Sequence, residues 1–220
     1  MKKTFYLAFL FLVVQHSNAQ NIIDFFYSIP AEYVDNLSFI ERKNLVKNKS
    51  LEISDMAYSL ECDVKNGYIR LGQNYTEGQS GYGVYEIAYW NLKNKKLIAL
   101  SSVLGSNGGF HQHNFKLFEY KNGSLSEVKT GYLKSYTSNF DVFINNLVTE
   151  FTKSNTKQSI KEELSDLQFT IELPRTGKNI KVAFEENPMS SPEYFTKTYG
   201  KYLNFREKTY KWNAVKEVFE

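Results

Sequence analysis

The chain contains a single cysteine, Cys62, among its 220 residues, so no disulfide can form within one molecule. Cys62 lies in a stretch where apolar side chains alternate with polar ones, between Leu60 and Val64, which predicts a small buried hydrophobe. An intermolecular disulfide or a reactive thiol is the alternative interpretation. Without internal disulfides, the hydrophobic core alone must stabilise the fold.

The chain also has little excess charge of either sign and few long apolar runs. The formal net charge is +3, and Lys2 and Lys3 at the N-terminus contribute two of these charges. A chain this close to neutral offers no electrostatic basis for binding nucleic acid or an anionic membrane. Beyond residue 19, no apolar run approaches the roughly 20 residues that a membrane-spanning helix needs. The sequence therefore predicts neither kind of partner and no membrane span.

One apolar run stands at the N-terminus. Lys2 and Lys3 precede the apolar stretch Thr4–Val14, and the small residues Ser17 to Ala19 follow it. This order predicts a secretory signal peptide over residues 1–19, with the mature chain starting at Gln20. A membrane anchor is the alternative, but the run is about half the length of a spanning helix. We therefore expect an exported protein, either periplasmic or secreted.

The first half of the mature chain predicts short helices followed by strands. Apolar spacing indicates helices up to Asn48, one of them started by a capping box at Ser38 and Glu41. From Leu51 the apolar period changes to two. Hairpin signals follow at Asn66-Gly67 and Asn122-Gly123, so we expect an antiparallel meander that ends near Lys129.

The second half repeats the order of helix and then strand. Apolar residues at helical spacing predict a helix over Phe140–Phe151, and Ser191-Pro192 reads as the start of another that ends at Gly200. We expect strands over Leu167–Leu173, Ile180–Phe184, Tyr202–Phe205 and Tyr210–Phe219. The predicted fold is α+β, with helices on one face of antiparallel meander sheets. Residues 20–135 and 136–220 would form two similar units packed as one body.

His111 and His113 are the best candidates for metal ligands. Residues two apart on a strand face the same side, so both imidazoles could reach one ion. A metal site needs further ligands, and no cysteine or acidic cluster lies near them in the sequence. The acidic pairs Glu162-Glu163 and Glu185-Glu186 read as surface residues. The sequence thus predicts no cofactor and no catalytic residue, and the histidine pair stays an open candidate.

Two glycine-rich segments are expected to be loops. Gly105–Gly109 lacks the Gly-Lys-Ser/Thr ending of a phosphate-binding loop, and Gly78–Gly83 precedes a strand and lacks the spacing of a nucleophile elbow. Aromatic residues near these loops are candidates for binding a partner, because they offer large contact area. They could equally be half-buried sheet residues. The candidates are Tyr75, Tyr82, Tyr85 and Phe110, with Tyr75 and Tyr82 favoured because their loop offers little to bury them.

Two further segments carry a resemblance to a family. Asp24-Phe25-Phe26 leads through Ile29-Pro30 to Arg42–Val46, and Tyr89-Trp90-Asn91 leads to Lys96–Ala99. This pattern resembles secreted bacterial proteins of unknown function, found in many anaerobic and aquatic bacteria. The resemblance implies export and an α+β fold, and it implies no catalytic residues.

The sequence therefore favours an exported, non-enzymatic binding protein whose partner is a protein or a small ligand. A periplasmic immunity or inhibitor protein is the first alternative, because size, export and the lack of catalytic signals fit it equally well. A metal-dependent hydrolase that uses His111 and His113 is the second. Bound metal, lost when both histidines are replaced, would separate the second alternative from the other two.

Overall fold

The structure is a computed structural model, and it describes residues 20–77, 80–106, 111–167, 169–185 and 193–220. The predicted signal peptide, Phe110 and the predicted helix start at Ser191-Pro192 lie outside the described residues. Within them, the expected α+β fold with antiparallel sheets is confirmed.

The described part of the chain opens with helices, as predicted. These are α1 (Ile22–Ser28), the 3₁₀ helix η1 (Ala31–Tyr33) and α2 (Phe39–Asn48). The predicted capping box at α2 is present, because the Ser38 hydroxyl accepts from the Glu41 backbone and the Glu41 carboxylate accepts from the Ser38 backbone. A second capping box at Asn21 and Asp24 starts α1. These boxes fix where each short helix begins.

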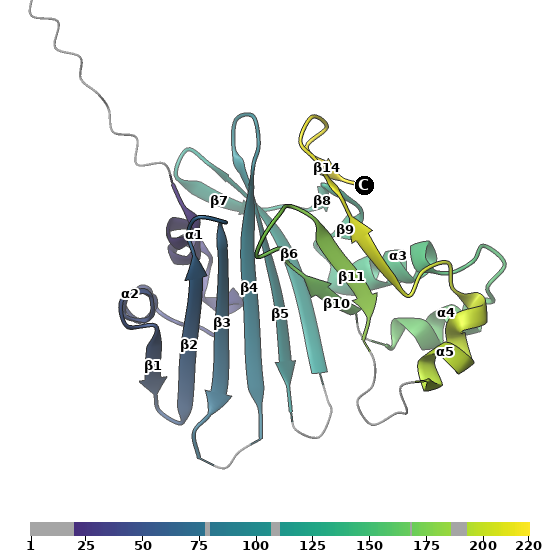
Figure 1. The fold of residues 1–220 in the computed structure, drawn as a ribbon, viewed down its shortest axis with the longest axis horizontal. Coiled ribbons are helices and arrows are strands. Elements are labelled where there is room, and N and C mark those ends of the chain that lie inside the picture. The colour runs from purple at the N-terminus through teal and green to yellow at the C-terminus, as the bar shows by residue number, and fades with distance from the viewer. Residues whose placement is uncertain (1–19, 78–79, 107–110, 168, 186–192) are drawn as a thin grey trace, which may run out of the picture.

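A seven-stranded antiparallel meander follows, with its strands side by side in chain order (Figure 1). The strands are β1 (Ser50–Ile53), β2 (Met56–Asp63), β3 (Tyr68–Tyr75), β4 (Tyr82–Asn91), β5 (Lys96–Gly105), β6 (His111–Lys121) and β7 (Ser124–Glu127). The predicted meander is therefore confirmed. One detail was wrong: Tyr75 and Tyr82 end β3 and begin β4 instead of lying in a loop, because pairing between these strands continues past the alternating core residues.

The remaining chain forms two small sheets and three α-helices. One sheet has the strand order β10-β11-β12 and the other has the order β13-β14-β9-β8. The elements are β8 (Thr130–Gly131), β9 (Leu133–Thr137), α3 (Phe140–Phe151), α4 (Gln158–Ser165), β10 (Phe169–Glu172), β11 (Ile180–Phe184), α5 (Tyr194–Tyr199), η2 (Gly200–Tyr202), β12 (Glu207–Tyr210), β13 (Trp212–Asn213) and β14 (Val218–Phe219).

Two of the expected strands differ from the structure. The segment Tyr202–Phe205 ends η2 and makes only an isolated bridge, between Leu203 and Thr152. The segment Tyr210–Phe219 is divided among β12, β13 and β14, because the chain turns back between Asn213 and Val218. Apolar alternation alone did not reveal these reversals.

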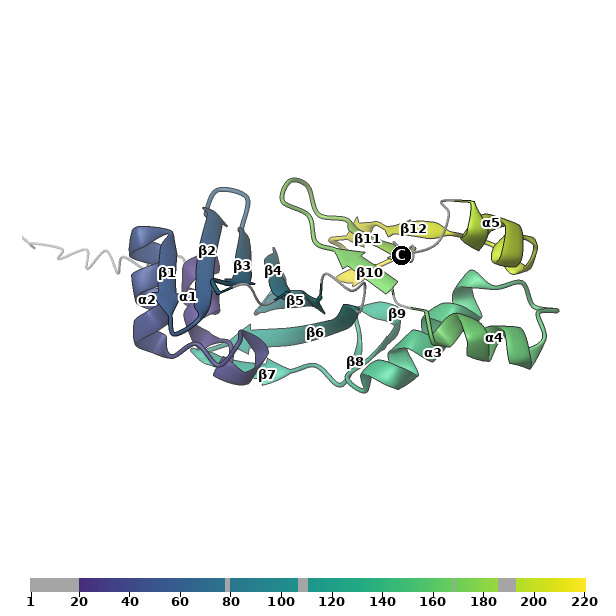
Figure 2. The same cartoon turned by 90° about the horizontal axis from the view of Figure 1, so that it is seen from below.

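The two faces of the meander bury two separate cores. Neighbouring residues on one strand point to opposite faces. Ile87 on β4 therefore packs with α1 residues such as Phe25, whereas Trp90 belongs to the core that contains α3 and the β10–β12 sheet. Figure 2 shows β10–β12 stacked over β5 and β6. This stacking brings distant parts of the chain onto the face of β6 that carries the histidines.

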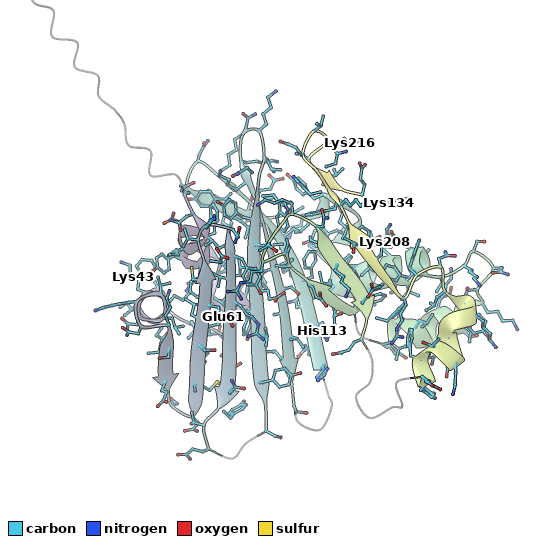
Figure 3. The ribbon with its side chains drawn as sticks, in the orientation of Figure 1. Lys43, Glu61, His113, Lys134, Lys208 and Lys216 are labelled. Carbon is cyan, nitrogen blue, oxygen red and sulfur yellow. The ribbon has the colours of Figure 1, made fainter. Side chains whose placement is uncertain are left out.

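Glu150 on α3 connects the helix to two sheets. Its carboxylate accepts a hydrogen bond from Lys208 Nζ on β12, at 2.6 Å, and another from the Ser135 hydroxyl on β9 (Lys208 is labelled in Figure 3). Burial raises the pKa of Glu150, but these hydrogen bonds and the charge of Lys208 outweigh it and hold the pKa below its ordinary value of 4.5. The folded state is therefore stabilised by the ionised carboxylate.

We expect Glu150→Gln to lower the free energy of unfolding at pH 7 by about 1–2 kcal/mol, because a charge-assisted hydrogen bond is lost. Since the folded-state pKa is depressed, this contribution is present above pH 4.5 and disappears as the pH falls through the folded-state pKa. Urea unfolding at pH 7 and near pH 3 measures it. The matched control is Glu172→Gln, whose exposed carboxylate lies 3.9 Å from Lys181. If Glu150→Gln lowers the free energy of unfolding as much at pH 3 as at pH 7, the ionised Glu150 carboxylate is not the source of the stabilisation.

Candidate metal site

His111 and His113 lie at the start of β6, on one face of the meander. Their partners on β5 are Gly105 and Val103. The His113 side chain is buried, and His111 is half-buried. Figure 3 shows His113 near the end of β6 that borders the stacked β10–β12 sheet. The prediction that both imidazoles face the same side is confirmed, because both contact the same carboxylate.

That carboxylate belongs to Glu185, one residue beyond the end of β11. Its Oε1 lies 2.5 Å from His111 Nδ1, and its Oε2 lies 2.9 Å from His113 Nε2. The expectation that Glu185 is a surface acid was therefore wrong, and the further ligand that the histidine pair lacks nearby in the sequence comes from a distant segment. The residues are more than 70 positions apart, at separations of 74 and 72. Only the stacking of the small sheet on the meander brings them together.

His111, His113 and Glu185 lie close enough together to share one metal ion. Within the described residues they are the only group of three or more His, Cys, Asp or Glu side chains that does so. Their ligand atoms all lie within 4.8 Å of one another. Burial raises the pKa of Glu185, but hydrogen bonds and charge from His113 and His111 outweigh it, so the pKa lies below its ordinary value. The carboxylate is thus ionised at neutral pH and available as an anionic ligand.

Tyr82 completes the surroundings of His111. Its hydroxyl lies 2.9 Å from His111 Nε2. In the tautomer whose Nδ1–H donates to the Glu185 carboxylate, Nε2 is an acceptor and the Tyr82 hydroxyl donates to it. The tyrosine reaches across β5 to do so, and a Cβ on Gly105 would lie 2.5 Å from its Cζ. Gly105 is therefore required for this contact, because any side chain there would displace the Tyr82 ring.

Two imidazole nitrogens and one carboxylate make a donor set that suits zinc and related divalent transition metals. Three protein ligands with a fourth position open are typical of catalytic zinc sites, whereas structural sites use four. The set fits a metal ion in type, charge and spacing. Nothing in the local sequence of Glu185 signals this role, so sequence reasoning had no means of finding the third ligand.

The predicted aromatic binding residues do not form one surface. Tyr82 lies at the histidine site, whereas Tyr85 points to the opposite face of β4 and lines another cavity. Tyr75 is exposed at the end of β3, where its ring covers Gly81. Phe110 lies outside the described residues. The aromatic cluster therefore separates into at least two places on the fold.

Comparisons with known proteins add no identity: no family model, no curated protein and no solved structure matches the chain. The resemblance to secreted bacterial proteins stays a prediction. Among the described residues, no helix is long and apolar enough to cross a membrane. Inferences about its function therefore depend on the α+β fold and on the geometry of the candidate sites.

Proposed function

We propose that this chain is an exported binding protein that holds a divalent transition-metal ion, with zinc as the first ion to test. The ligands are His111 Nδ1, His113 Nε2 and a carboxylate oxygen of Glu185. The observation that carries the proposal is the convergence of these three donors within 4.8 Å from chain segments far apart in sequence. Such convergence of unlike titratable groups, half-buried and pre-oriented, is what a metal site requires.

Tyr82 supports the proposal by orienting one ligand. An ion held by His111 Nδ1 would require the ring proton to be on Nε2, which would then donate to the Tyr82 oxygen 2.9 Å away. A hydrogen bond to the second ring nitrogen fixes the orientation and tautomer of a metal-bound histidine. The same contact therefore serves the ion-free and the ion-bound state.

A metal-dependent hydrolase is the second candidate. A cavity of about 240 Å³ adjoins His113 and is lined also by Arg70 and Glu86. An ion with an open position beside such a cavity could activate water, which is the role of zinc in hydrolases. Metal-dependent hydrolysis of a generic ester or phosphate substrate, abolished together with metal binding, would favour this candidate. The third possibility, an immunity or inhibitor protein, would show itself by a stoichiometric protein partner.

The test is a zinc titration of the chelator-treated mature chain, residues 20–220, against a chromophoric competitor. We expect one ion per chain. Glu185→Gln should weaken binding by roughly 100-fold, because even the loss of outer contacts to a ligand costs about 10- to 100-fold. Cobalt binding should add visible absorption bands that the variant lacks.

The matched control is Glu119→Gln, which removes a carboxylate paired with Lys95 at 2.7 Å, away from the histidines. It should bind zinc like the parent chain. Circular dichroism of both variants checks that the fold is retained. Failure of the parent chain to bind zinc, cobalt or nickel, or equal binding by Glu185→Gln, would rule the proposed ligand set out.

A further inference from the structure

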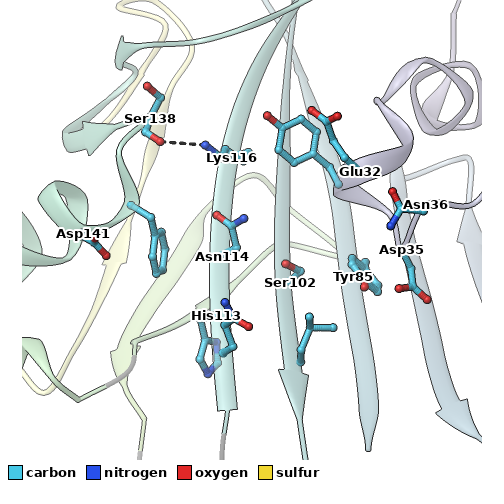
Figure 4. A pocket seen from close by; sticks show the side chains of 14 residues that line it. Glu32, Asp35, Asn36, Tyr85, Ser102, His113, Asn114, Lys116, Ser138 and Asp141 are labelled. Atoms are coloured by element: carbon cyan, nitrogen blue, oxygen red, sulfur yellow. Dashed lines mark hydrogen bonds between the residues drawn. The ribbon is translucent and has the colours of Figure 1, made fainter.

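A second and larger cavity lies on the opposite face of the meander. It is a groove of about 510 Å³ that crosses β4, β5 and β6 (Figure 4). Its floor includes Tyr85, Ser102 and Asn114. One wall comes from η1 and the turn after it, and the other comes from Ser138 to Asp141 at the start of α3. Both halves of the chain therefore build it.

Two polar groups in the floor lack partners. Tyr85 is 5% exposed, and its hydroxyl makes no hydrogen bond within the described residues. Burial, with the nearby charge of Asp35, raises the pKa of Tyr85, so the hydroxyl stays protonated. Asn114 Oδ1 is a buried acceptor that likewise has no partner in the part of the chain that the structure describes. A ligand in the groove that bonds the Tyr85 hydroxyl gains binding free energy, because this hydroxyl lines the groove and has no protein partner within the described residues.

The walls of the groove are acidic. Glu32 and Asp35 lie on one side, and Asp141 lies on the other. The one lysine in the lining, Lys116, is already engaged: its Nζ donates to Glu127 Oε1 at 2.8 Å and to the Ser138 carbonyl at 2.9 Å. Asp35 Oδ2 accepts a hydrogen bond from the Tyr58 hydroxyl at 2.6 Å, which leaves the charge of the carboxylate in place. The groove thus offers a surplus of negative charge to a ligand.

A bare metal ion does not suit this arrangement. Within the described residues, the carboxylates of the groove do not converge as the donors at His111 do. Acidic groups spread over both walls, with aromatic rings of Tyr33 and Phe140 among them, suit an extended organic cation. Aromatic faces and carboxylates both attract ammonium groups, and amide oxygens accept their N–H bonds.

We propose that this groove binds an organic amine that carries more than one ammonium group. Asp35 and Asp141 neutralise ammonium groups from opposite walls, and the Tyr85 hydroxyl bonds a polar atom of the ligand. The groove is distinct from the candidate metal site: His113 is the one residue that borders both, and its imidazole contacts Glu185 on the other face of the sheet.

The test uses calorimetric titration of the chelator-treated mature chain with spermidine and with a trimer of glucosamine. The matched neutral probe is the N-acetylglucosamine trimer, which has the same rings without the ammonium groups. We expect binding of at least one amine, no comparable binding of the acetylated trimer, and weaker binding as salt increases. The two amines separate a polyamine ligand from an amino-sugar ligand.

Two conservative variants locate the site. Tyr85→Phe removes only the hydroxyl, and Asp35→Asn keeps a residue type that tolerates the left-handed backbone at this position, where φ is 56°. Each should weaken amine binding by about 10-fold, the equivalent of one good hydrogen bond or charge contact. Glu185→Gln and Glu119→Gln should bind amines like the parent chain.

Absence of binding by both amines, equal binding of the acetylated trimer, or unchanged binding in both groove variants would overturn the proposal. Because Glu185→Gln leaves the groove intact, loss of zinc binding and loss of amine binding are separate outcomes. Failure at one site therefore does not count against the other.

Discussion

Replacing Trp90 with alanine should lower the free energy of unfolding by about 3–5 kcal/mol, the usual cost of truncating a large buried aromatic residue. Trp90 is fully buried at the junction between the meander and the C-terminal strands. Its ring lies edge-on to Phe219, with centroids 5.1 Å apart, and beside Trp212 at 6.1 Å. The indole Nε1 also donates to the Lys178 carbonyl at 2.9 Å. One side chain therefore joins β4 to β14, β13 and the β10–β11 turn.

Urea unfolding followed by far-ultraviolet circular dichroism measures this loss. The matched control is Trp212→Ala, which truncates the same residue type at a half-buried position and should cost clearly less. Trp90→Phe should fall between the two, because it keeps much of the apolar contact but leaves the Lys178 carbonyl without its donor. Equal losses for Trp90→Ala and Trp212→Ala would contradict the central role of Trp90.

Arg42→Met should cost roughly 3 kcal/mol, because it removes two hydrogen bonds from a charged donor and leaves their acceptors unsatisfied. Arg42 lies on α2, and only 5% of its surface is exposed. Its Nη1 donates to the carbonyls of Phe26, at 2.7 Å, and Ile29, at 2.6 Å. These carbonyls lie at the C-terminal end of α1, where a positive charge is favoured by the helix dipole. Methionine keeps the aliphatic length and so isolates the polar contribution.

The neighbouring Lys43 provides the control. It is exposed and lies over the Phe39 ring at 4.6 Å, so Lys43→Met should change stability by about 0.5 kcal/mol or less. Thermal and urea unfolding of the two variants should therefore separate clearly. A loss for Arg42→Met as small as that for Lys43→Met would mean that water replaces the guanidinium without cost.

Local signals predicted much of the fold. The apolar spacing of Phe140–Phe151 gave the bounds of α3 as the structure has them, and the capping box at Ser38 placed the start of α2. The Asn-Gly pairs located the β2–β3 and β6–β7 hairpins. Each of these features depends on residues close together in the chain, whose physical preferences can be read without knowing the rest of the structure.

The candidate sites depended on contacts that no local pattern encodes. The histidine spacing indicated a shared face of β6, but Glu185 joins it only because one sheet stacks on another. Similarly, Tyr85 was a candidate as an aromatic residue near a loop, yet its significance comes from a hydroxyl left without a partner beneath walls from two distant segments. In both cases the site is formed by the packing of distant segments, which local secondary-structure propensity does not encode.

The alternation along β6 makes both sites depend on one register. His113 faces the metal site and Asn114, its neighbour, faces the groove, while β5 pairs them with Val103 and Ser102. A slip of β6 by a single residue would turn the imidazoles toward the groove and the amide toward Glu185. A misregistered β5–β6 hairpin would therefore abolish both proposed binding sites together, although every residue of both sites was still present.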